Sequence, residues 1–220
     1  MKTIRVTGKG KIKVHPDMTR ITVTLDGLWP EYGEAVKHSA EDSEVLKDLL
    51  EPFGFAKKDV KTLSFSVDPE YESYEEKHVW KQRLNGYRFR RTMKLEFDSD
   101  NGLLGKILFA LANAEKITPE FRISYTVKDP EASKNALLAA AVTDSAAKAK
   151  VLAKAAGAKL GELQSIDYSW GEISFEVAPM RQMSAKMMVD SAAEYDSYDV
   201  DIEPDDIEVT DTVTLVWEIV

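Results

Sequence analysis

Four glutamates that lie close together in the sequence are the first residues to consider for chemistry. They are Glu70, Glu72, Glu75 and Glu76, and they surround Tyr71 and Tyr74. Paired carboxylates do acid–base work when burial or proximity separates their pKa values, and several carboxylates together can bind a divalent cation. We expect this segment to be an exposed hairpin, and exposure favours neither acid–base catalysis nor binding of a divalent cation. A carboxylate-based enzyme, or a binder of a small ligand or divalent metal, is therefore the alternative function rather than the leading one.

A second carboxylate group near the C-terminus offers oxygen ligands for Ca²⁺. Asp199, Asp201 and Asp205 belong to an acidic run, and hard cations bind to several oxygens at once. The spacing does not match the EF-hand loop, and no glycine stands at the required turn position. We interpret the run as a solvated acidic linker and assign no metal and no cofactor.

Other motifs for catalysis or cofactor binding are incomplete. His15, His38 and His78 lie far apart and form no metal-binding spacing. The absence of cysteine rules out disulfides, thiolate catalysis and Cys-type zinc sites. Gly8 and Gly10 form a G-x-G, but no third glycine follows. No helix is expected there either, as a dinucleotide loop would require, so we expect a close backbone approach in a strand.

A group of cations is the best candidate for an interaction surface. Arg88, Arg90 and Lys94 fall on one face of a predicted strand, with Lys81 and Arg83 nearby. This group could bind an acidic protein partner, and such binding would weaken at high salt. The alternative is an ordinary solvated face of a sheet.

Composition limits the classes of partner. The 220 residues carry a net charge of −9. Residues 189–220 hold eleven acidic and no basic residues, which leaves −9 + 11 = +2 for residues 1–188. We expect no nucleic-acid binding, because that depends on clustered cations. No window has the roughly 20 apolar residues of a membrane span. No export signal is visible at the start, so we expect a cytoplasmic protein.

The pattern of elements predicts an α+β fold with largely antiparallel sheets and packed helices, in the order ββαββαβαββ. Two strands, near residues 4–14 and 21–25, are expected to form a hairpin across His15-Pro16-Asp17. A helix should run from Pro30-Glu31 to Pro52-Phe53-Gly54. We expect a single domain over residues 1–220, which could be divided into two lobes, about 1–100 and 101–220.

One long charged hairpin is predicted in the first half of the chain. Strands beginning at Leu63 and Tyr87 flank Asn85-Gly86, a strong turn signal. We expect a mobile tip near residues 75–84.

The second half begins with a long alanine-rich helix. Asp129 should cap it, Pro130 suits its first position, and Gly157 suits its end. Its small side chains allow close packing on a sheet. Residues 176–206 lose periodicity, and we predict a flexible acidic and Met-rich excursion there. Met183 and Met187 in that segment are candidates for adaptable contacts.

Four segments together resemble the SIMPL domain family, a bacterial domain of unknown function. They are Val6-Thr-Gly-Lys-Gly10 with Val14-His-Pro-Asp17, the Gly86-Tyr87 strand, the helix segment from Ala141 through Asp144, Lys148, Leu152 and Gly157 to Gly161, and the terminal strand from Ile207. The resemblance covers nearly the whole chain. It implies an α+β fold, self-association and loosely defined roles in stress or signalling, and it supplies no catalytic residues. Many relatives look periplasmic, whereas no export signal is visible here.

Taken together, the sequence predicts a non-enzymatic module for protein interaction and self-assembly. We expect a homo-oligomer, because long edge strands invite pairing between subunits. The interaction residues we predict are Arg88, Arg90, Lys94, Lys81, Arg83, Met183 and Met187.

Overall fold

The protein has the predicted α+β architecture, built from two compact units. The computed structural model describes residues 2–168, 173–177 and 202–220. The first unit comprises Met1–Asp17, Thr126–Val177 and Pro204–Val220, and the second comprises Met18–Tyr125 and Ala178–Glu203. Each unit is therefore assembled from segments that are distant in the sequence. The lobe boundary considered near residue 100 lies inside the second unit.

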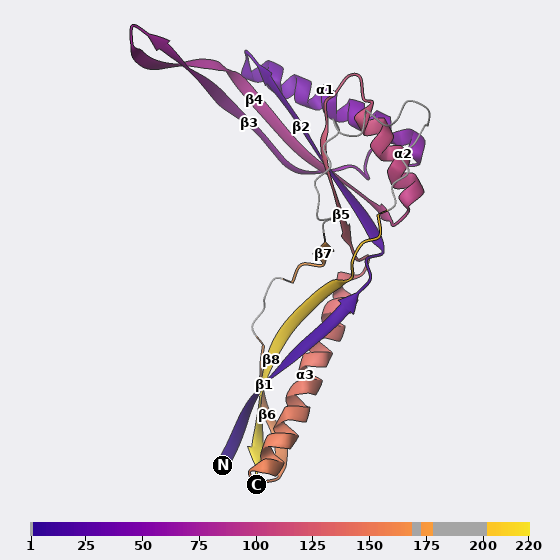
Figure 1. Ribbon diagram of the computed structural model, residues 1–220, viewed down its shortest axis with the longest axis vertical. Helices are drawn as coiled ribbons and strands as arrows, with labels where there is room; N and C mark the ends of the chain where they lie inside the picture. The colour runs from indigo at the N-terminus through magenta and orange to yellow at the C-terminus, as the bar shows by residue number, and fades with distance from the viewer. Residues whose placement is uncertain (1, 169–172, 178–201) are drawn as a thin grey trace. The chain divides into compact units, whose positions relative to one another are not determined.

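The first unit contains a three-stranded sheet and one long helix (Figure 1). The strand order is β1-β8-β6, formed by β1 (Lys2–Val14), β8 (Ile207–Ile219) and β6 (Leu160–Asp167). Strand β1 pairs antiparallel with β8 in unbroken register, from Lys2↔Ile219 to Val14↔Ile207. Helix α3 (Pro130–Ala155) packs on β1 and β8. The two ends of the chain thus close one sheet.

Helix α3 approaches β1 closely because both surfaces are made of small residues. The stripe Leu137, Ala141, Ser145, Ala149 and Ala153 repeats every four residues and is buried. A Cβ added to Gly8 would lie 2.0 Å from the Ala141 carbonyl oxygen, and one added to Gly10 would lie 2.2 Å from that of Leu137. The two glycines therefore serve a close approach between backbones, as the sequence predicted.

Two polar contacts fix the helix along this strand. The buried Ser145 hydroxyl donates to the Val6 carbonyl oxygen at 3.0 Å, and the Lys9 amide donates to Asp144 Oδ2 at 2.7 Å. Asp144 also pairs with Lys148 at 2.6 Å. Hydrogen bonds from Lys148 and then from the Lys9 amide hold the pKa of Asp144 below its usual value.

The ends of α3 follow the predicted capping. Asp129 Oδ1 accepts a hydrogen bond from the Ala132 amide at 2.9 Å, and Pro130 is the first helical residue. Gly157 follows the helix with φ 70°, a left-handed conformation that glycine adopts without steric cost.

The predicted hairpin between the first two strands is wrong. Strands β1 and β2 (Met18–Trp29) belong to different sheets, and β2 pairs with β4 (Val79–Asp98). The connecting residue Asp17 is bound elsewhere: its amide donates to the Thr126 carbonyl oxygen at 3.2 Å, and its Oδ1 accepts from the Lys128 amide at 2.8 Å. The turn therefore passes the chain to a new sheet instead of closing a hairpin.

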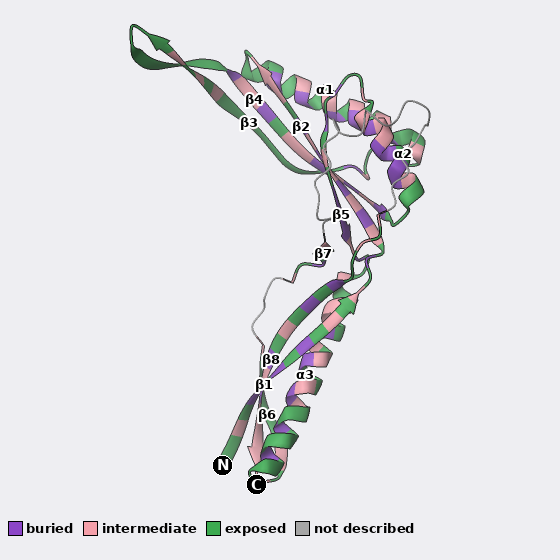
Figure 2. Cartoon of the chain, viewed as in Figure 1, coloured by how far each residue is buried: buried purple, intermediate pink, exposed green. Residues whose placement is uncertain are grey.

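The second unit packs two helices against a sheet. The strand order is β3-β4-β2-β5, with β3 (Lys61–Glu76) at one edge and β5 (Glu120–Thr126) beside β2. Helix α1 (Tyr32–Leu50) packs on β2 and β4, a short 3₁₀ turn, η1 (Glu51–Phe53), follows it, and α2 (Asn101–Ala112) contacts α1. Purple, buried positions mark the inner side of these elements in Figure 2. The short strand β7 (Glu176–Val177) lies in the first unit.

Strands β3 and β4 form the predicted long hairpin, but its turn is not at Asn85-Gly86. The turn is Lys77-His78, whose φ angles of 52° and 64° are the left-handed values of a two-residue hairpin loop. Asn85 is instead an extra residue in β4, because the register shifts from Glu70↔Gly86 to Tyr71↔Leu84. Asn85-Gly86 therefore forms a β-bulge, and the observed turn lies eight residues before the predicted one.

A substitution at Gly8 tests the close packing of α3. Gly8→Ala should lower the free energy of unfolding by about 1–3 kcal/mol, because the new methyl group would overlap the Ala141 carbonyl. Gly33→Ala is the matched control: Gly33 lies in α1 with open space around its Cα, so alanine should change stability by at most about 1 kcal/mol, in the stabilising direction. Thermal and denaturant unfolding of both variants measures this, and equal effects would contradict the packing argument.

Candidate interaction surfaces

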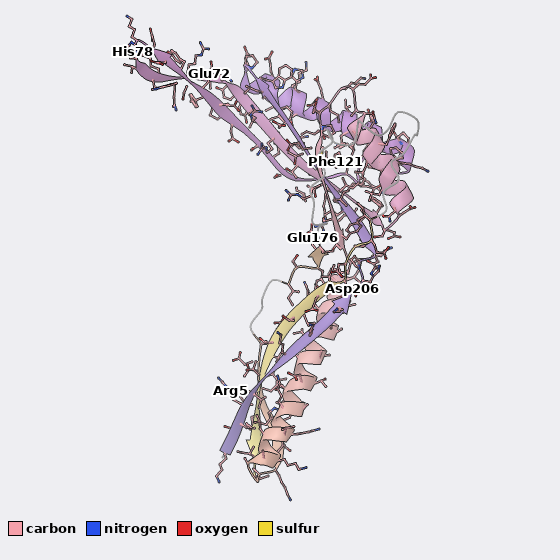
Figure 3. The ribbon with its side chains drawn as sticks, in the orientation of Figure 1. Arg5, Glu72, His78, Phe121, Glu176 and Asp206 are labelled. Atoms are coloured by element: carbon pink, nitrogen blue, oxygen red, sulfur yellow. The ribbon has the colours of Figure 1, made fainter. Side chains whose placement is uncertain are left out.

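The end of the β3–β4 hairpin extends beyond the rest of its sheet. Strand β2 pairs with β4 only as far as Trp29↔Tyr87, whereas β3 and β4 continue to Glu76↔Val79. Residues 70–86, the arm, therefore form a two-stranded ribbon with both faces exposed (Figure 1). Figure 3 labels His78 at its end and Glu72 part of the way along. A two-stranded ribbon is marginally stable in water on its own, so the contacts at its base are important for its stability.

The register divides the arm into two chemically different faces, since opposed residues in a ladder share a face. The aromatic face consists of the pairs Tyr71↔Leu84, Ser73↔Gln82 and Glu75↔Trp80. The charged face consists of the pairs Glu72↔Arg83, Tyr74↔Lys81 and Glu76↔Val79.

The aromatic face leaves large apolar side chains in solvent. Trp80 is 72% exposed, Tyr71 59% and Leu84 46%. Exposed single apolar residues are ordinary, but three on one face of a thin ribbon form a surface suited to binding. Tyr71 and Trp80 are also of the residue types that dominate binding energies at interfaces.

The charged face is a ladder of ion pairs. Lys81 pairs with Glu76 at 2.6 Å, Arg83 pairs with Glu72, and Arg83 also lies 5.4 Å from the centre of the Tyr74 ring. These cations were predicted to form a positive surface. The structure places a carboxylate against each of them.

The other predicted cations lie at the base of the arm and beyond it. Arg88 donates to Asp26 on β2 at 2.8 Å and to Glu70 on β3, so it connects three neighbouring strands. Lys94 pairs with Glu96 at 2.8 Å. Among the residues that the structure describes, Arg90 is exposed and has no ion pair. Sequence alternation could not reveal that Arg88 has carboxylate partners on two neighbouring strands.

Aromatic contacts brace the base of the arm. Trp29 at the end of β2 stacks on His38 of α1, with ring centres 3.5 Å apart and planes 9° apart. Tyr32 meets Tyr87 edge to face at 5.8 Å. Gly86 lies so close to Trp29 that an added Cβ would be 2.6 Å from the Trp29 carbonyl oxygen. The arm thus leaves the sheet at a fixed point.

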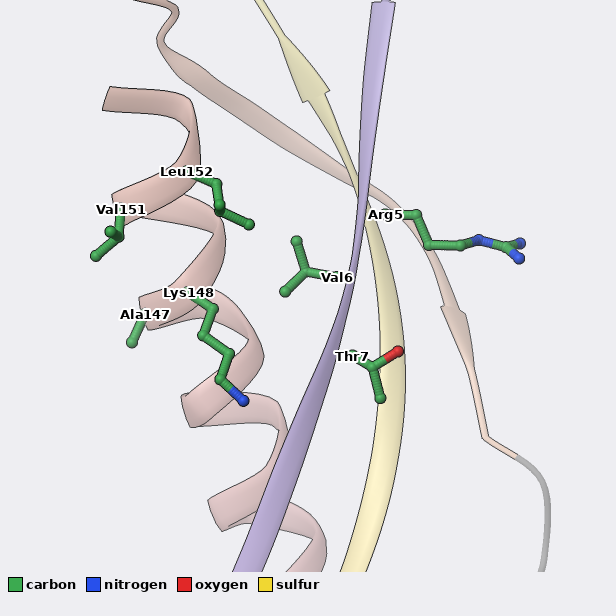
Figure 4. Close-up of a pocket in the computed structure, with 7 residues that line it drawn as sticks. All are labelled: Arg5, Val6, Thr7, Ala147, Lys148, Val151 and Leu152. Atoms are coloured by element: carbon green, nitrogen blue, oxygen red, sulfur yellow. The ribbon is translucent and has the colours of Figure 1, made fainter. Parts of the chain in front are cut away.

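The first unit contains a separate apolar groove of about 600 Å³ between β1 and α3 (Figure 4). It is lined by Arg5, Val6, Thr7, Ala147, Lys148, Val151 and Leu152. Val6 points toward the helix, while the Arg5 side chain points to the other side of the strand. Val151 is 67% exposed and Leu152 49%. This groove could not be predicted from the sequence, because its shape depends on how α3 lies along β1.

The carboxylates considered for catalysis are engaged in ion pairs. Glu70 pairs with Arg88, which lowers the pKa of Glu70. Glu75 lies 3.3 Å from His78, in addition to the Glu72 and Glu76 pairs above. The hydrogen bond from Arg88 thus favours the ionised form of Glu70.

The other candidate ligands do not converge in the part of the chain that the structure describes. His15 lies 3.3 Å from Asp206, and His38 lies 3.1 Å from Glu41. Asp205 Oδ1 accepts a hydrogen bond from the Asp206 amide at 2.8 Å. Within residues 2–168, 173–177 and 202–220, no three His, Asp or Glu side chains are grouped to hold a metal. Asp199, Asp201, Met183 and Met187 lie outside the described residues, as does most of the 176–206 segment.

Among the described helices, none combines the length and apolar character of a membrane span.

A family model described as SIMPL, protein of unknown function (DUF541), matches residues 4–217. The chain belongs to the SIMPL family. "Uncharacterized protein YggE" of Escherichia coli strain K12 is 28% identical over 196 residues, which span 87% of this chain and 75% of that relative. The proteins of the same name in Escherichia coli O157:H7 and Shigella flexneri match equally. The predicted SIMPL resemblance, and with it a bacterial family of unknown function, is confirmed.

The three-strand connection by Arg88 is tested by Arg88→Gln. Glu70 should lose its stabilising partner, so its pKa should rise toward the ordinary value, and amide exchange in residues 70–86 should become several-fold faster. In the wild type the connection is complete above the ordinary glutamate pKa and is lost as pH falls through the lowered pKa of Glu70. Carboxyl titration and hydrogen exchange, both followed by NMR, measure the two effects.

Arg90→Gln is the control, since it removes a neighbouring arginine of the same strand that has no described ion pair. If both variants accelerate exchange in the arm equally, Arg88 does not hold the base of the arm.

Proposed function

We propose that this SIMPL-family protein is a non-enzymatic interaction module that self-associates through the aromatic face of its arm. The observation that carries this proposal is the exposure of Tyr71, Trp80 and Leu84 together on one face of a ribbon that extends beyond its sheet. Burying apolar surface is favourable at roughly 25 cal/mol per Å², and association would cover surface that the isolated chain leaves in water.

The construction of the arm supports a binding role. Its base is fixed by Arg88 and by the aromatic contacts of Trp29 and Tyr87, so the ribbon is held in position before any partner arrives. Preorganisation of this kind lowers the entropic cost of binding. The ion pairs keep the charged face hydrated, on the side of the ribbon opposite the aromatic face.

The other candidate functions have less support. An acidic protein partner would need the cations of β4, yet Arg88, Lys81, Arg83 and Lys94 already contact carboxylates. A carboxylate enzyme would need unpaired or unequally buried acids, and Glu70, Glu72 and Glu76 are exposed or half-buried and paired. The possible stress or signalling role rests on family resemblance alone.

Two tyrosines on opposite faces of the arm provide a matched test. Tyr71→Ser should weaken self-association by about tenfold or more, because an exposed aromatic of the binding face is lost. Tyr74→Ser makes the same change three residues later on the charged face and should leave association nearly unchanged. Sedimentation velocity across the micromolar range gives the dissociation constants.

A wild-type chain that stays monomeric throughout that range would contradict the proposal. Equal weakening by the two serine variants would show that the aromatic face has no special role.

A further inference from the structure

Two of the strands that end the sheets, β1 and β3, carry opposite charges. Each lies at the end of its sheet's strand order, so one side of each has no neighbouring strand among the described residues. Strand β1 carries Lys2, Arg5, Lys9, Lys11 and Lys13 and no acidic residue. Strand β3 carries Asp68, Glu70, Glu72, Glu75 and Glu76 and a single cation, Lys61.

The charges also alternate in the same way with respect to the apolar sides of the two strands. In β1, Arg5, Lys9, Lys11 and Lys13 lie on the exposed face, while Val6, Gly8 and Gly10 face α3. In β3, Glu70, Glu72 and Glu76 lie on the charged face, while Tyr71 lies on the aromatic face. If β3 lay beside β1 with its aromatic face toward α3, Glu70, Glu72 and Glu76 would share a face with four of the five cations of β1, while Glu75 and Lys2 would lie on the side of α3.

The groove beside β1 provides space for the aromatic face. It runs along Arg5–Thr7 and continues onto Val151 and Leu152, which are exposed on α3. An added strand at this edge would direct alternate side chains into the groove, as in recognition by β-augmentation. Tyr71 and Trp80 have the size and character to fill it.

We propose that the open edge of β1 beside α3 receives strand β3 of a second copy of this chain, so that copies associate head to tail. This inference rests on the proposed self-association and names the receiving site. Opposite charges on facing strands are attractive, whereas β1 against β1 or β3 against β3 would place like charges together. The edge charges therefore select the unlike pairing and oppose the two like ones.

The ion pairs already present are compatible with this contact. Among the described residues, Lys11 forms an ion pair with Glu208 at 2.6 Å, and Lys9 and Lys13 interact with the same carboxylate at longer range, while Arg5 has no described ion pair. The carboxylates of β3 are paired with β4, but each carboxylate has two oxygens and accepts from more than one donor. High salt, about 0.5 M, should weaken the association by screening these exposed charges.

A mixing experiment tests the direction of assembly. Val151→Glu should weaken self-association by about tenfold or more, with Val142→Glu as the control on the same helix, outside the groove. A head-to-tail contact needs one arm and one groove. Mixing Tyr71→Ser, which keeps its groove, with Val151→Glu, which keeps its arm, should therefore give dimers that neither variant forms alone.

A charge exchange tests the strand pairing. Glu72→Arg combined with Arg83→Glu keeps the ion pair within the arm but reverses the charge at its edge. This variant, and Arg5→Glu combined with Lys9→Glu, should each lose association, and the four changes together should restore it.

The outcomes separate this inference from the function on which it rests. If Tyr71→Ser weakens association while Val151→Glu and the charge exchange do not, self-association through the arm stands and β1 is not its receiver. If Tyr71→Ser has no effect, both proposals fail. Loss in both variants, with recovery on mixing, supports both.

Discussion

The close contact between α3 and β1 is the constraint on which the rest of the structure depends. A hydrogen bond from Ser145 to the Val6 carbonyl and one from the Lys9 amide to Asp144 set the position of the helix along the strand. Gly8 and Gly10 make that distance possible, because any side chain there would overlap the helix backbone. The same contact leaves Val151 and Leu152 beside an open strand edge, so the packing that stabilises the unit also creates its groove.

In the second unit, the position of the arm is likewise set by a few close contacts. Its strands outrun β2, and they are held at the base by one arginine with carboxylate partners on two strands and by stacked aromatic rings. Beyond that point, none of the described helices covers either face. The ion pairs make the charged face compatible with water. On the aromatic face, Trp80 is exposed and buries little apolar surface within the described chain. Packing among the described residues leaves that side chain in solvent, and the proposed self-association would cover it.

Local signals in the sequence predicted the helices well. Asp129, Pro130 and Gly157 act within a few residues of each other, so capping chemistry was enough to place α3. The pairing of strands was harder to predict from the sequence. His15-Pro16-Asp17 has good turn chemistry, but its partners are Thr126 and Lys128, more than a hundred residues away. Asn85-Gly86 likewise forms a bulge because the longer pairing through Lys77-His78 adds more ladder contacts.

The interaction surfaces could also be predicted only in part, because strand alternation is local in the sequence whereas contacts between strands are not. Alternation located Arg88, Arg90 and Lys94, but the carboxylates that pair with Arg88 (Asp26 and Glu70) come from the neighbouring strands β2 and β3. The aromatic face could be identified only once the structure had shown that the turn lies at Lys77-His78.

Hydrogen exchange of the wild-type protein at low and high concentration tests the account most directly. Slower exchange on concentration in both residues 70–76 of β3 and residues 2–7 of β1 is the predicted result, and exchange in these segments that does not depend on concentration would contradict it.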